Sequence, residues 1–169
     1  MSTTTSTVVA LIAAALLQVA VAPHIAIFGV VPNLLMLVVV TLALIEGPVS
    51  GAVAGFAAGL LFDVLGSAAI GPAALVLSVV GYVAGMLQEN LFAESWIVPA
   101  TVVFIATLVG EASYALLLGA LGADVAVGEA LLRIAVPGAA YSTVLAVLAF
   151  PWLARLLRHD RSMATLGGL

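Results

Sequence analysis

Long apolar stretches separated by short polar breaks run along the whole chain. Residues 1 to 45 contain no Asp, Glu, Lys or Arg. They are interrupted at Ala22-Pro23-His24, where proline removes a backbone donor and disfavours helix at the residue before it. A helix that crosses a hydrocarbon core of ~30 Å uses about 20 residues. The pattern therefore predicts six membrane-spanning helices, which we place at residues 7–22, 33–45, 49–65, 72–88, 96–121 and 129–157.

The composition excludes the other common classes of protein. Of the 169 residues, 65% are hydrophobic and 7% are charged, whereas a soluble domain has about 25% charged residues. So few charges cannot form a polar surface, and a disordered chain would need low hydrophobicity and high charge. Six helices with short loops use almost the whole length. We therefore expect one all-α, polytopic membrane domain over residues 1–169.

Several functions lack the residues that they need. Lysine and cysteine are absent, and four arginines leave a net charge of −4. A basic surface for nucleic acid and a thiolate metal site are therefore excluded. His24 and His159 lie far apart without carboxylates at metal-ligand spacing, and no catalytic motif occurs. We expect no enzyme activity, no metal and no cofactor.

Orientation in the membrane depends on few charges. Arg155, Arg158 and Arg161 follow the last predicted helix, and the positive-inside rule places that end in the cytoplasm. With six spans, both termini are expected in the cytoplasm. Arg133 then lies on the outer side, four residues after Glu129, a spacing that permits a helical ion pair.

A ladder of glycines is the most specific feature of the helix at 49–65. Gly47, Gly51, Gly55 and Gly59 recur every four residues, and the next step is Asp63. Residues four apart share one side of a helix. In lipid, helices associate through close backbone contact, which glycine permits. We expect this side to pack tightly against protein, either within the bundle or as a groove for a partner helix.

The same spacing recurs in the helix at 72–88, where Gly81, Gly85 and Glu89 are four residues apart. A second helix therefore has a side of small residues that ends in an acid. Single glycine pairs at this spacing are weak signals, whereas four glycines in register are considerably stronger.

Two acids within predicted helices are candidates for a functional or structural role, because a charge at the bilayer centre costs roughly 2.5 kcal/mol or more. Asp63 lies near the end of its helix and is expected to be an interfacial carboxylate or the partner of a helix end. Glu111 lies deeper in the helix at 96–121. It is expected to pair with a neighbour such as Arg133, to be protonated, or to line a cavity.

These motifs together resemble the bacterial rod shape-determining protein MreD family. The resemblance covers roughly residues 30–90, and its most specific element is Gly-Phe-x-x-Gly-Leu-x-x-Asp, which contains Phe56. The motifs that carry it are Pro32-Asn33-Leu34-Leu35, Glu46-Gly47-Pro48, Gly51-x3-Gly55-Phe56-x2-Gly59-Leu60-x2-Asp63, Gly71 and Gly81-Tyr82-x2-Gly85.

The resemblance implies a subunit of the cell-elongation machinery in the bacterial inner membrane. Such proteins act with MreC, MreB, the glycosyltransferase RodA and a class B penicillin-binding protein. They are similar in fold to the substrate-binding subunits of energy-coupling-factor vitamin transporters. We expect a non-enzymatic scaffold in contact with membrane lipid, with MreC as its nearest partner.

Three other functions remain open from the sequence. A vitamin-transporter subunit would need an outward pocket lined by polar side chains. A carrier or scramblase of lipid-linked precursors would need a polar track, for which Glu111 and Arg133 are the candidates. A minimal membrane enzyme is disfavoured because catalytic groups are missing.

Overall fold

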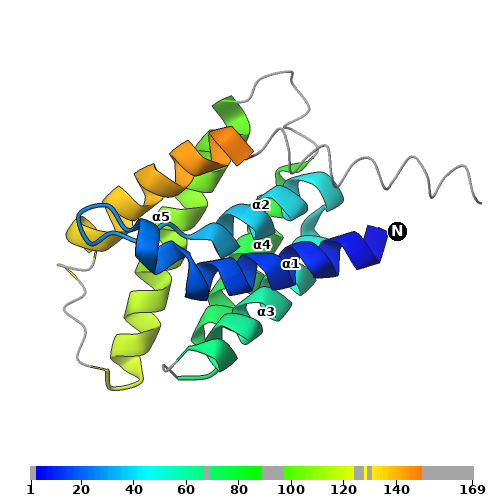
Figure 1. Ribbon diagram of the computed structural model, residues 1–169. Helices are drawn as coiled ribbons and strands as arrows, with labels where there is room; N and C mark the ends of the chain where they lie inside the picture. Colours follow the sequence, from blue (N-terminus) through cyan, green and yellow to red (C-terminus); the bar gives the residue numbers. More distant parts are fainter. Residues whose placement is uncertain (1–2, 67–68, 89–96, 124–127, 129–130, 150–169) are drawn as a thin grey trace, which may run out of the picture.

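The computed structural model describes residues 3–66, 69–88, 97–123, 128 and 131–149, and it confirms the all-helical prediction. Figure 1 shows the helices packed side by side in one bundle. The sixth helix runs to Ala149 and begins with a π-helical turn, η3. The elements in chain order are α1 (Thr3–Ala20), the 3-10 turn η1 (Ala22–Ile25), α2 (Leu34–Glu46), α3 (Pro48–Leu65), α4 (Pro72–Met86), α5 (Ile97–Ala120) and η3 (Leu131–Ala135).

The predicted breaks coincide with the observed helix ends to within a few residues. The proline at position 23 lies in η1, so α1 ends at Ala20. Gly47, at φ +94°, separates α2 from α3 in a conformation that favours glycine. The π-helical turn ends at Ala135, two residues before Pro137, which has no backbone N–H to donate to the helix. Residues 129–130 and 150–157 of the last predicted helix lie outside the described residues.

The helices differ in their capacity to cross a bilayer. Among the described residues, three are long and apolar enough: Pro48–Leu65, Pro99–Ala120 and Leu132–Ala149. The apolar helices Leu34–Glu46 and Pro72–Met86 are shorter. At 1.5 Å per residue, the 13 residues of α2 extend only about 20 Å. The six predicted spans are thus present as helices. Helices α2 and α4, with 13 and 15 residues, fall short of a full crossing by length, whereas α1 has 18 residues, as many as α3.

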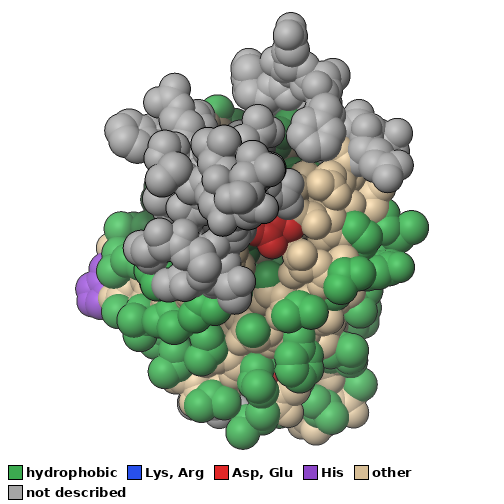
Figure 2. Space-filling model, turned by 90° about the vertical axis from the view of Figure 1, so that its right-hand side faces the viewer, with side chains coloured by type: hydrophobic (Ala, Val, Ile, Leu, Met, Phe, Trp, Pro, Cys, Tyr) green, Lys and Arg blue, Asp and Glu red, His purple; other side chains and the backbone are tan. Residues whose placement is uncertain are grey.

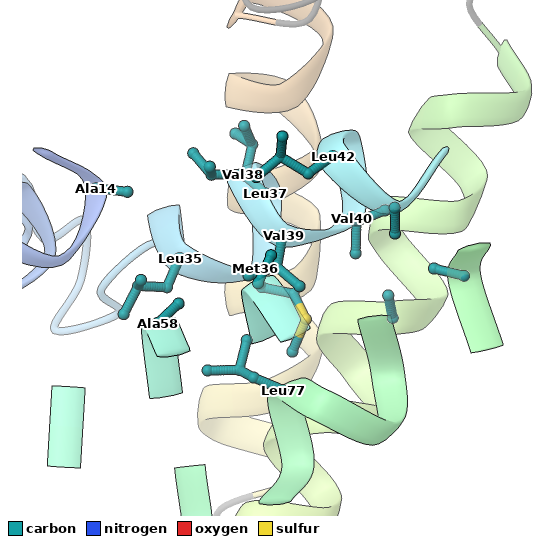
Figure 3. Packing of buried hydrophobic residues seen from close by; sticks show 14 of the residues in the cluster. Ala14, Leu35, Met36, Leu37, Val38, Val39, Val40, Leu42, Ala58 and Leu77 are labelled. Carbon is teal, nitrogen blue, oxygen red and sulfur yellow. The ribbon is translucent and has the colours of Figure 1, made fainter. Parts of the chain in front are cut away.

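The short helix α2 lies at the centre of the bundle. Every residue from Leu35 to Ile45 is buried, and α2 contacts α1, α3, α4 and α5. Figure 3 shows the labelled side chains of α2 pointing to several sides, with Met36 next to Leu77 of α4. Non-helical backbone at membrane depth is tolerated where protein surrounds it. The other helices therefore allow α2 to be shorter than the hydrocarbon core.

Helices α3 and α4 form the closest pair in the structure. A Cβ atom added to Gly51, Gly55 or Gly59 would overlap the backbone carbonyl of Gly81, Leu77 or Ala73, respectively. Each step of four residues along α3 is matched by a step of four backwards along α4, so the helices are antiparallel. Gly85 meets the backbone of Pro48 in the same way. The groove that the glycines form on α3 is therefore filled by α4.

Gly55→Ala should lower the free energy of unfolding by at least about 1–3 kcal/mol, the usual cost of overpacking a tight contact. The reason is that the obstructing atoms belong to the backbone of Leu77 and Ser78, which cannot rotate away. Equilibrium unfolding in mixed micelles measures the change. Gly138→Ala is the control, since its Cβ would meet Val30 at 3.6 Å, an ordinary contact. Equal stability of the two variants would contradict the close contact.

Candidate functional site

Asp63 lies at the end of α3 and binds the beginning of α4. Its carboxylate accepts hydrogen bonds from the backbone N–H groups of Gly71 (2.9 Å), Ala73 (3.3 Å) and Ala74 (3.1 Å). The side chain is only 2% exposed. The first N–H groups of a helix lack partners within the helix and favour a negative charge. The structure thus places Asp63 against protein, as the partner of a helix end.

A network of polar side chains surrounds the amino end of α2. Gln18 of α1 accepts a hydrogen bond from the N–H of Leu34 (2.6 Å) and donates one to the carbonyl of Pro32 (3.1 Å). The side chain of Asn33 accepts from the N–H of Met36 at 2.8 Å. These two amides therefore satisfy backbone groups that a helix leaves open at its beginning.

Asn33 also connects α2 to two further helices. Its side-chain N–H donates to Oε1 of Glu111 on α5 at 2.6 Å, and its backbone N–H donates to the hydroxyl of Ser142 on the sixth helix at 2.8 Å. Glu111 thus has Asn33 as its hydrogen-bond partner. We name the group formed by Gln18, Asn33, Glu111 and Ser142 the polar node.

A cavity of about 540 Å³ opens beside the polar node. Gln18, Asn33, Glu111 and Tyr114 contribute its polar side chains, and most of the remaining wall is apolar. The apolar side chains come from the chain between α1 and α2 and from five helices; they include Val31, Met36, Phe62, Val76, Leu77 and Ile134. Of the three expectations for Glu111, the structure shows that it lines a cavity.

The remaining candidate residues lie in different places. Phe56 is 53% exposed on α3, directly after Gly55 in the chain. Gly47 lies near Gln88, which donates a hydrogen bond to the carbonyl of Ile45 at 2.8 Å. Arg133 is exposed at the start of the sixth helix. Glu89, Glu129 and the arginines at 155, 158 and 161 lie outside the described residues.

Comparison with known proteins identifies the family. The family model of the rod shape-determining protein MreD matches residues 1–159. The chain belongs to the MreD family. The match extends well beyond residues 30–90 and includes α1, α5 and the sixth helix, so this MreD family member is a rod shape-determining protein of the membrane. No curated protein and no solved structure matches the chain. The similarity to vitamin-transporter subunits therefore stays a prediction.

The sequence of this MreD family member does not predict that the residues of the polar node lie together. Gln18 and Ser142 are common polar residues in apolar helices, and their spacing from Asn33 carries no local pattern. The Pro32-Asn33 pair before an apolar run does match a helix start, and it marks where α2 begins. The partners of Asn33 lie 78 and 109 residues away in the chain, so only the folded bundle reveals them.

Asp63→Ala should lower the free energy of unfolding by about 1–3 kcal/mol, because buried N–H groups of α4 lose their acceptor. Asp63→Asn keeps one acceptor oxygen and should lose less. Unfolding in mixed micelles compares both with Glu46→Ala, which removes a carboxylate whose bond to Thr7 is long, at 3.5 Å. Equal losses for Asp63→Ala and Glu46→Ala would exclude the capping role.

Proposed function

We propose that this chain is a non-enzymatic scaffold of the cell-elongation complex in the bacterial inner membrane, and that it binds the membrane helix of MreC. MreB, RodA and a class B penicillin-binding protein belong to the same proposed complex. The match to the MreD family supports the assignment to rod-shape determination. In the described residues, no group of His, Asp and Glu side chains could hold a metal ion.

The partner surface that we propose is the outer stripe of α3. Exposed apolar side chains recur along one side of this helix at steps of three or four residues: Val49, Val53, Phe56, Leu60 and Val64. Hydrophobic side chains also cover much of the described surface on the face in Figure 2, so exposure alone does not identify a partner site. Lipid chains contact such surfaces by default.

Phe56 is the observation that favours this stripe over the other apolar faces. It belongs to the Gly-Phe-x-x-Gly-Leu-x-x-Asp element on which the resemblance to the family depends. Within that element, Gly55 and Gly59 contact α4 and Asp63 binds its first turn. Packing within the bundle thus accounts for these three residues, whereas Phe56 remains 53% exposed. A large aromatic side chain is a frequent anchor of protein interfaces.

Phe56→Ala should weaken the association with MreC at least about tenfold, equivalent to 1.4 kcal/mol, because the aromatic anchor is lost. Energy transfer between labelled proteins in lipid vesicles measures the affinity. The control is Leu116→Ala, which truncates a 58% exposed side chain on α5. It should leave both the affinity and the unfolding curve unchanged. An undiminished affinity of the Phe56 variant would contradict the proposed surface.

A further inference from the structure

We infer that the cavity beside the polar node binds an amphipathic primary amine, with Glu111 as its counter-charge. This inference concerns a binding site within the bundle and does not depend on the outer stripe of α3. It can therefore hold even if MreC binds elsewhere.

The size and lining of the cavity suit a ligand with one polar end. Small-molecule sites are typically about 300–1,000 Å³, mostly apolar, with a few polar groups that fix the orientation. The cavity of about 540 Å³ has this character. Met36, Phe62 and Leu77 contribute apolar walls, whereas Glu111 and Tyr114, one helical turn apart on α5, contribute polar groups.

The chemistry of Glu111 selects the polar end of the ligand. One carboxylate oxygen accepts the hydrogen bond from Asn33, and among the described residues the second oxygen has no hydrogen-bond partner. No arginine or histidine is among the described residues that line the cavity. A carboxylate in apolar surroundings is unfavourable unless it is paired. An ammonium group carries a positive charge and three donors, which complement this acceptor.

Asn33 holds Glu111 in position before any ligand binds. Its backbone N–H is bound to Ser142, and its side-chain oxygen accepts from the N–H of Met36. The amide is thus fixed at two points, so the carboxylate needs little rearrangement to receive a cation. Such preorganisation favours binding because less conformational freedom is lost.

The same chemistry occurs in a membrane lipid and in a soluble amphipathic amine. Phosphatidylethanolamine has a primary ammonium that is joined through a phosphodiester and glycerol to its acyl chains. Octylamine is a water-soluble amine in which the ammonium is joined directly to an apolar chain. Phosphatidylcholine differs from phosphatidylethanolamine in its ammonium group, which has no N–H donor. Comparison of these three probes separates hydrogen bonding by the ammonium from unspecific lipid contact.

The experiment titrates the delipidated full-length protein in a neutral detergent with each probe and measures the bound fraction by native mass spectrometry. Phosphatidylethanolamine, octylamine or both should bind at least about tenfold more tightly than phosphatidylcholine. Glu111→Gln should abolish this preference. Glu46→Gln, which neutralises a carboxylate at the opposite end of α2, should preserve it.

A second variant tests the cavity without changing a charge. Gly138 lines the cavity, and its added Cβ would make only ordinary contacts, so Gly138→Leu introduces bulk beside the cavity from a position that accepts a Cβ. It should reduce amine binding at least about tenfold. Gly128→Leu is the matched control, because a Cβ at Gly128 meets no atom within 4 Å. If Glu111→Gln fails to fold, the comparison of Gly138→Leu with Gly128→Leu still tests whether the amines bind in the cavity.

Each outcome has a defined meaning. Binding of phosphatidylethanolamine that octylamine displaces identifies a lipid headgroup, and binding of octylamine alone identifies a soluble amine as the source. Equal affinity for phosphatidylethanolamine and phosphatidylcholine, without tighter binding of octylamine, would overturn the inference. It would also be overturned if a folded Glu111→Gln variant kept the preference, or if Gly138→Leu bound the amines as tightly as the unchanged protein.

Discussion

In a bilayer, an apolar helix gains little by exchanging lipid contacts for contacts with another apolar helix, so association depends on how closely the backbones approach. In this protein the antiparallel contact of α3 and α4 meets that requirement. Gly51, Gly55 and Gly59 each allow a carbonyl of α4 to lie where a Cβ would otherwise be. Asp63 closes the pair by binding the first N–H groups of α4. The two helices thus form a closely packed pair, which α1, α2 and α5 contact.

The central position of α2 follows from this arrangement. The α3–α4 pair contacts α2 on one side, and α1 and α5 contact it on others. Because protein surrounds α2, the helix can be shorter than the hydrocarbon core. Its amino end then lies within the bundle, and the backbone N–H groups of its first turn need hydrogen-bond acceptors from other residues. Gln18 and Asn33 provide them. The polar node and the cavity beside it are therefore consequences of a short helix inside a longer bundle.

The sequence predicts those features of the structure that depend on residues close together in the chain. The helix positions follow from apolar runs, and the four-residue glycine spacing predicts a closely packed side of α3. The partner of that side was left open, because spacing along one helix does not specify a neighbour. The sequence did not predict the central place of α2. Residues 34–45 are apolar apart from Thr41 and carry no charge, and a helix that is apolar on all sides suits contact with lipid as well as burial in protein. The bond from Asn33 to Glu111 joins residues 78 apart, a pairing that no local pattern encodes.

The separation of α3 and α4 is the most direct test of this account. Magic-angle-spinning NMR of the protein in lipid bilayers can measure the distance between the Cα of Gly55 and the carbonyl carbon of Leu77 after selective ¹³C labelling. The account predicts a strong cross-peak at van der Waals separation, about 4 Å. Absence of this cross-peak, with the helix axes at the usual separation of roughly 8–10 Å, would contradict it.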